Sequence, residues 1–127
     1  MIIPLPKRLA PAFICLCLIA TGAWAQTQEQ VQERLVDSVK TAEQEANSAA
    51  AKFKANDAAG GCTDLRATAA DTAASLELAR QLSGLISENT ALNEETRGRM
   101  LQDVLSLSAT LVSQKQGMDT QITARCN

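Results

Sequence analysis

The chain has 127 residues, of which 46% are hydrophobic but only 2% aromatic, and its formal net charge is −2. It contains no histidine, so it lacks the most common side chain for general base catalysis and for metal binding. The scarcity of aromatic rings argues against a stacking platform for single-stranded nucleic acid and against an aromatic-lined small-molecule pocket. We therefore expect a single domain that is not an enzyme, uses no cofactor and has no catalytic, cofactor-binding or metal-binding residues.

Residues 1–25 have the three regions of a secretory signal peptide. Lys7 and Arg8 give a positive start, an apolar stretch follows, and small residues flank the tryptophan of the Ala-Trp-Ala segment that ends at Ala25. We predict cleavage between Ala25 and Gln26 and a periplasmic or secreted location. Cys15 and Cys17 lie inside the apolar stretch, away from its end, so a lipid anchor is not expected.

Removal of this segment would change the composition of the protein. It would take away two of the 12 basic residues and none of the 14 acidic ones, so that the net charge becomes −4. It would also take away every proline and leave Phe53 as the one aromatic residue. A chain of this charge is not drawn to nucleic acid or to anionic lipid. We expect a protein partner, no nucleic-acid partner, no membrane contact after cleavage, and a monomer or a homodimer.

Residues 26–127 are rich in helix-forming residues and repeat apolar residues at helical spacing. This pattern predicts an all-α fold, an antiparallel up-down-up bundle with helices at about 27–59, 63–88 and 94–124. The first helix is expected to begin after Thr27 as N-cap and to end at the glycine pair 60–61. Its apolar stripe consists of Val31, Leu35, Val39, Ala42, Ala46, Ala49 and Phe53.

The second predicted helix has two adjacent apolar rows, which is typical of a helix between two neighbours. Thr63 or Asp64 could serve as its N-cap. Thr72 lies on the buried face, where its hydroxyl can bond to a carbonyl one turn earlier. The third helix is expected to begin after Asn93, with two glutamates in its first turn. Short connections would make successive helices antiparallel.

Cys62 and Cys126 are the cysteines that remain after cleavage, and an exported protein meets an oxidising compartment. Cys62 lies near the start of the second predicted helix and Cys126 at the end of the third, and these ends are neighbours in an antiparallel hairpin. The predicted turn leaves a mismatch of about 7.5 Å along the helix axes. Fraying near Gly117, or a turn closer to Asn93, would remove it. We predict a disulfide that stabilises the hairpin by about 4 kcal/mol in the chain-entropy model.

The carboxylates of the chain do not form a recognisable catalytic arrangement. Glu43 and Glu45 are two positions apart and therefore point away from each other on a helix. Asp64 and Asp71 share a helix face, but aspartate is common on helix surfaces and at caps. The alanine-rich segment 49–51 allows close approach of another helix, either within the core or from a partner.

These observations predict an exported helical accessory factor of the cell envelope that acts by binding. The alternative keeps the apolar residues 9–25 as a membrane anchor, with a helical rod outside the membrane and the two cysteines joining two copies. In that form the layout resembles the inner-membrane spanin subunits of phage lysis systems, in its single N-terminal span, its helical periplasmic region and a cysteine, Cys126, next to the C-terminal residue. The Ala-Trp-Ala segment and the glycine pair favour the cleaved, folded bundle.

Overall fold

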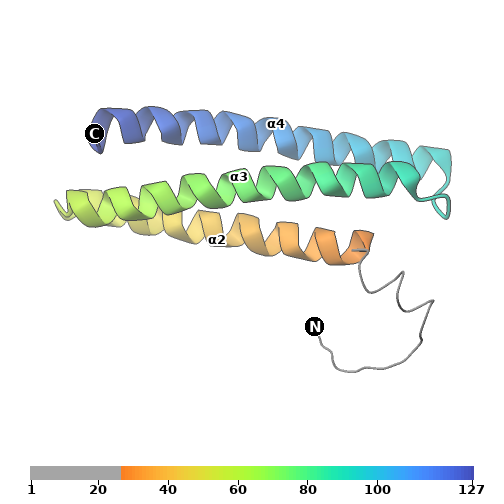
Figure 1. Cartoon of the computed structure of the whole chain (residues 1–127), viewed down its shortest axis with the longest axis horizontal. Coiled ribbons are helices and arrows are strands. Elements are labelled where there is room, and N and C mark those ends of the chain that lie inside the picture. Colours follow the sequence, from red (N-terminus) through yellow and green to blue (C-terminus); the bar gives the residue numbers. More distant parts are fainter. Residues whose placement is uncertain (1–26) are drawn as a thin grey trace, which may run out of the picture.

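The computed structural model describes residues 27–127, so the predicted signal peptide and its cleavage site between Ala25 and Gln26 lie outside the described residues. Three helices follow along the chain: α2 (Gln28–Lys54), α3 (Ala58–Glu88) and α4 (Glu94–Arg125). They form an antiparallel three-helix bundle, in which α3 lies between α2 and α4 (Figure 1). The predicted all-α, up-down-up fold is confirmed.

Two of the predicted helix starts are present with the expected caps. The Thr27 hydroxyl accepts a hydrogen bond from the Gln30 amide, and the Gln30 side chain accepts one from the Thr27 amide, each at 3.1 Å. This reciprocal capping box satisfies two backbone donors at the start of α2. The Asn93 side chain accepts from the Thr96 amide at 2.8 Å and caps α4 with this single bond.

The predicted boundary between the first two helices was wrong by about five residues. α2 ends at Lys54 rather than at residue 59, and α3 begins at Ala58 rather than at residue 63. Asn56 makes the turn with a φ of 64°, in the left-handed region that asparagine tolerates better than most residues. The Asp57 side chain then caps α3 by accepting from the Gly60 amide at 2.9 Å. An Asn-Asp pair thus ends the first helix before the glycine pair is reached.

The core of the bundle is centred on α3. This helix contributes 11 buried residues, compared with four from α2 and two from α4. The main apolar cluster joins all three helices near the turn between α3 and α4 and consists of Val31, Leu35, Leu78, Ala79, Leu82, Ile86 and Val104. The backbones of α2 and α4 each contact α3 but do not contact each other. α3 is therefore the helix with two neighbours that its two apolar rows predict.

Candidate functional site

A groove runs between α2 and α4, with α3 as its floor. Three open hollows follow one another along it, with volumes of about 440, 320 and 500 Å³. The first two share Val39, and the second and third share Ala46 and Met118, so each hollow adjoins the next. We call this feature the α2–α4 groove. It exists because the two outer helices pack on α3 and leave the space between them unfilled.

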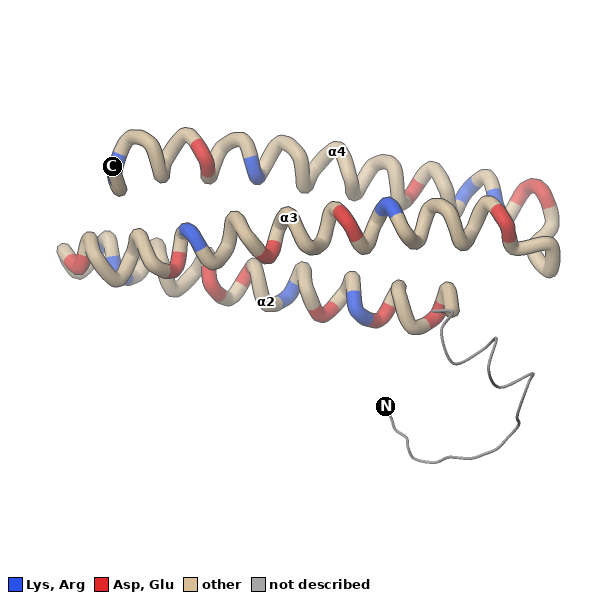
Figure 2. Tube along the Cα trace, viewed as in Figure 1, with Lys and Arg blue, Asp and Glu red and all other residues tan. Residues whose placement is uncertain are grey.

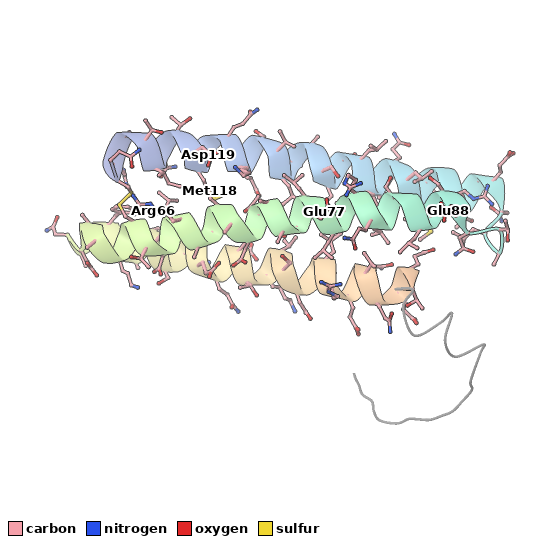
Figure 3. All side chains as sticks on the ribbon, viewed as in Figure 1. Arg66, Glu77, Glu88, Met118 and Asp119 are labelled. Carbon is pink, nitrogen blue, oxygen red and sulfur yellow. A yellow bond between two sulfur atoms is a disulfide. The ribbon has the colours of Figure 1, made fainter. Side chains whose placement is uncertain are left out.

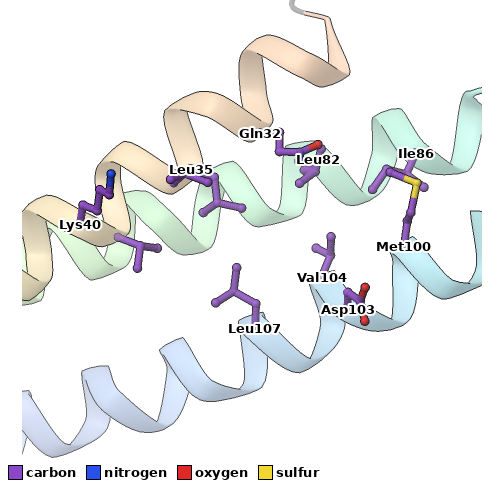
Figure 4. Close-up of a pocket in the computed structure, with 11 residues that line it drawn as sticks. Gln32, Leu35, Lys40, Leu82, Ile86, Met100, Asp103, Val104 and Leu107 are labelled. Carbon is purple, nitrogen blue, oxygen red and sulfur yellow. The ribbon is translucent and has the colours of Figure 1, made fainter.

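The part of the groove nearest the α3–α4 turn is the most apolar. Leu82 and Ile86 of α3 lie at its floor, and aliphatic and methionine side chains of the outer helices line both walls (Figure 4). The wall residues are Leu35, Val36 and Val39 on α2 and Met100, Val104 and Leu107 on α4. Val36 is 50% exposed, so a large apolar side chain faces solvent at the rim. This surface has the character of a site for another apolar surface.

Charged side chains are distributed unevenly along the groove. Lys40 and Asp103 line the hollow near the α3–α4 turn, and Glu43 lines the middle one. Lys54 and Arg125 line the hollow at the opposite end, where α2 and α4 both finish (Figure 2). Within residues 27–127 none of these five side chains forms an ion pair. Their charges are available to a molecule that occupies the groove.

The disulfide closes the end of the bundle opposite the α3–α4 turn. The Sγ atoms of Cys62 and Cys126 are 2.04 Å apart and the Cα atoms 5.7 Å apart, which confirms the predicted pair. The bond lies within one chain and joins α3 to the end of α4. Arg66 adds a hydrogen bond of 2.8 Å from its guanidinium to the Cys126 carbonyl, at the same end of the bundle (Figure 3).

Fraying near Gly117, one of the two ways considered to remove the register mismatch, does not occur, because α4 stays helical to Arg125. The register is instead adjusted at the other end, where α4 begins beyond the end of α3 (Figure 1). Arg97, one turn into α4, donates hydrogen bonds to the carbonyls of Asn89 and Leu92 in the connection, at 3.1 and 2.8 Å. These two bonds hold the connection that sets the offset between the helices.

Phe53 fills the junction between the three helices at the disulfide end. A Cβ atom at Gly61 would lie 2.9 Å from the ring, so only glycine allows this approach. The Arg125 guanidinium lies over the ring, 4.6 Å from its centroid. Gly61 was predicted to end the first helix, but its role in the structure is to let α3 pack closely against Phe53.

A row of polar contacts joins α2 to α3 outside the groove, and we call it the polar seam. The hydroxyls of Ser38 and Ser75 are 2.8 Å apart. Farther along, the Ser48 hydroxyl donates to Asp64 at 2.6 Å, and the Lys52 ammonium pairs with the same carboxylate at 2.8 Å. Asp64, considered as a helix cap from the sequence, is thus a partner for α2. The Lys52 ammonium and the Ser48 hydroxyl hold the pKa of Asp64 below its usual value.

Glu45 occupies the middle of the polar seam and faces Asp71. A hydrogen bond between the two carboxyl groups, followed by burial and by the negative charges of Asp71 and Asp64, raises the pKa of Glu45 from 4.5 to about 7. The Glu45 Oε1 atom is buried without a hydrogen-bond partner among the described residues. Glu43 lies on the groove side of α2, so the two glutamates point apart as helix geometry requires. The sequence pattern did not reveal the Glu45–Asp71 pair, because its members lie on different helices.

No protein-family model, curated protein or solved structure matched this chain in the three comparisons. Among residues 27–127, no group of three or more His, Cys, Asp or Glu side chains is arranged to hold a metal ion. None of the three described helices combines the length and the hydropathy needed to cross a bilayer. The α2–α4 groove is the candidate functional site because it combines apolar walls with unpaired charges.

Proposed function

We propose that this chain is an exported, non-catalytic accessory protein of the cell envelope that binds an amphipathic helix of a partner protein in the α2–α4 groove. The observation that carries this proposal is that α2 and α4 both pack on α3 while their backbones do not contact each other. Three helices arranged in this way present the space that a fourth helix occupies in a four-helix bundle. Binding by insertion of a helix into an apolar groove is a recurrent mode of protein recognition.

The shape of the groove supports a helical occupant. Its lining on α2 extends from Gln32 to Lys54, which corresponds to about 33 Å along a helix axis. A partner helix of roughly 22 residues would match this length at 1.5 Å per residue. The lining alternates apolar floor residues with polar rim residues such as Gln32 and Gln114. A helix with one apolar face and polar flanks is complementary to this arrangement.

The export part of the proposal is supported by the signal-peptide pattern of residues 1–25 and by the disulfide. A bond between Cys62 and Cys126 is suited to an oxidising compartment such as the periplasm or the extracellular space. The non-catalytic part is supported by the absence of histidine from the sequence. Glu45, whose pKa is raised to about 7, lies on the polar seam rather than in the groove.

The test is a binding titration of the exported protein, purified without reductant, with a fluorescent amphipathic probe peptide of about 22 residues. The probe carries leucine and isoleucine at heptad spacing, and a scrambled peptide of the same composition serves as the control. We expect saturable binding of the probe and none of the scrambled peptide. Equal binding of both peptides, or of neither, would refute the proposal.

A matched pair of variants locates the binding surface. Val36→Arg places a charge on the groove rim, and Leu105→Arg places one on an α4 side chain that is 64% exposed and outside the groove. We expect Val36→Arg to weaken binding at least tenfold, since about 1.4 kcal/mol is enough for that change. Leu105→Arg should leave the affinity within twofold. The opposite ranking of the two variants would place the binding surface elsewhere.

A further inference from the structure

The two ends of the α2–α4 groove differ in charge. At the disulfide end, the lining contains the cations Lys54 and Arg125 and no acidic side chain. Toward the α3–α4 turn, Asp103 and Glu43 lie on opposite walls together with a single cation, Lys40. The lining charge is therefore +2 at one end and −1 over the rest of the groove. A helix that fits both regions must itself carry opposite charges at its two ends.

The directions of the wall helices add a second preference. α2 and α4 run the same way and both end at the disulfide end, at Lys54 and Arg125. Their last carbonyl groups give that end a partial negative charge, and the first amide groups of a helix carry a partial positive charge. A partner helix that lies between α2 and α4 is therefore favoured when its N-terminus is at the disulfide end. This is also the direction in which α3 runs.

The two preferences agree with the normal charge pattern of a helix. Acidic residues are favourable in the first turn of a helix and basic residues in the last turn. An occupant that begins at the disulfide end would place acidic side chains beside Lys54 and Arg125. Its basic C-terminal half would lie between Asp103 and Glu43. The opposite direction would place a basic C-terminal end beside the two cations.

The side chains of the α2 wall suit close packing at the disulfide end. Ala46, Ala49 and Ala50 line the hollow there, whereas Leu35, Val36 and Val39 line the other end. Small wall residues leave space beside the α2 backbone, so the first turns of the occupant can carry larger apolar side chains. Phe53 and Leu65 lie at the bottom of this hollow and offer an apolar contact.

We infer that the partner segment is an amphipathic helix with an acidic N-terminal half and a basic C-terminal half, and that it binds parallel to α3 with its N-terminus at the disulfide end. This inference rests on the proposed binding function and adds the chemistry and the direction of the partner. It concerns a segment of another protein. A second copy of this chain would appear as a change in oligomeric state without peptide and would contradict the inference.

The test compares two probe peptides with the same apolar stripe and opposite charge order. The forward peptide has glutamates in its first two turns and lysines in its last two, and the reversed peptide has the opposite arrangement. At low salt we expect the forward peptide to bind at least fivefold more tightly than the reversed one. The ratio should shrink as salt screens the charges.

A nitroxide label on the N-terminus of the forward peptide reports its direction. We expect the label to broaden the NMR signals of Met118 and Leu65 at the disulfide end and to spare those of Met100 and Leu107. Lys54→Glu should reduce the preference for the forward peptide or reverse it, whereas Arg80→Glu, which makes the same change of charge at an exposed ion pair outside the groove, should not. Arg80 and Lys54 are both surface cations, so these variants differ mainly in their position.

The outcomes separate the inference from the proposed function. Equal affinity for the two peptides, or broadening of Met100 and Leu107 by the label, would overturn the direction and leave the binding function intact. If neither peptide binds, both statements fail.

Discussion

The two outer helices are attached to α3 in different ways. α2 is held along its length by the polar seam, in which Ser38 meets Ser75 and both Ser48 and Lys52 meet Asp64. α4 is held by apolar contacts along its length, and its described polar and covalent attachments lie at the two ends. These are the Cys62–Cys126 disulfide, the Arg66 hydrogen bond and the loop contacts of Arg97.

This difference teaches how a small aliphatic protein can keep a groove open. Specific contacts fix each outer helix to α3, so α2 and α4 do not need to pack on each other. The apolar side chains between them remain available to a partner. Each of the following changes tests one of the two attachments, in order of expected size.

The largest effect is expected from removing the disulfide. Cys62→Ser together with Cys126→Ser releases a loop closed by a bond between residues 64 positions apart. In the chain-entropy model this costs about 4 kcal/mol of unfolding free energy. Urea denaturation measures the loss, and hydrogen exchange locates it. Exchange should rise most in the last turns of α4, whereas equal loosening of α2 would contradict the separate attachment of the two helices.

A smaller loss is expected where all three helices meet. Gly61→Ala would push a methyl group against Phe53, because a Cβ atom there lies 2.9 Å from the ring. Overpacking of this kind costs about 1–3 kcal/mol, reduced by the better helix propensity of alanine. Thermal unfolding should show a lower Tm.

The matched control for this change is Gly84→Ala. A Cβ atom at Gly84 meets nothing within 4 Å, so this variant should be stabilised by up to about 1 kcal/mol. If both variants had the same effect on Tm, the close approach of Gly61 to Phe53 would not be a determinant of packing.

The polar seam is tested by Ser75→Ala. Ser75 is fully buried, and the change to alanine removes one of the two α3 partners of the Ser38 hydroxyl, leaving the Asp71 carbonyl at 3.3 Å, at a cost of about 1 kcal/mol. Hydrogen exchange should rise in the middle of α2 and stay low in α4. Thr110→Ala, which removes an exposed hydroxyl bonded within α4, is the control and should leave α2 unchanged.

The smallest effect concerns the pH dependence of stability. The folded-state pKa of Glu45 is raised from 4.5 to about 7, so the folded protein binds more protons than the unfolded chain between these values. The contribution of Glu45 to the free energy of unfolding is therefore complete below about pH 4.5, and it is lost as the pH rises through about 7. Glu45→Gln should flatten this fall and raise Tm by a few degrees at pH 8.

Tm measured between pH 4 and pH 8 provides the check for Glu45. Glu43→Gln is the control, since Glu43 lies on the groove side of α2 and does not face Asp71. A variant at Glu45 that retained the full slope of the parent would show that its carboxyl group does not control this pH dependence.

Much of the fold could be predicted because the signals are local or topological. Thr27 and Asn93 are strong caps within a few residues of the helices they begin. The disulfide followed from the position of Cys62 and Cys126 at neighbouring helix ends. The first turn was misplaced because a glycine pair was weighted above an Asn-Asp pair, and the close contact that explains Gly61 involves Phe53 on another helix.

The candidate site was much less accessible from the sequence. The apolar stripe of α2 was identified, but the groove that its residues line depends on the angle at which α2 and α4 pack around α3. The Glu45–Asp71 contact depends on the register between two helices in the same way. Periodicity shows which face of a helix is apolar, whereas the gap between two helices is a property of the assembled bundle.

Methyl NMR of the protein, with and without the forward peptide, tests the central claim most directly. We predict that chemical-shift changes concentrate on the groove side chains Val36, Val39, Met100 and Leu107, with little change at Leu105 and Val112, which lie outside the groove. Changes concentrated at Leu105 and Val112, with the groove signals unmoved, would contradict the claim that the space between α2 and α4 is the binding surface.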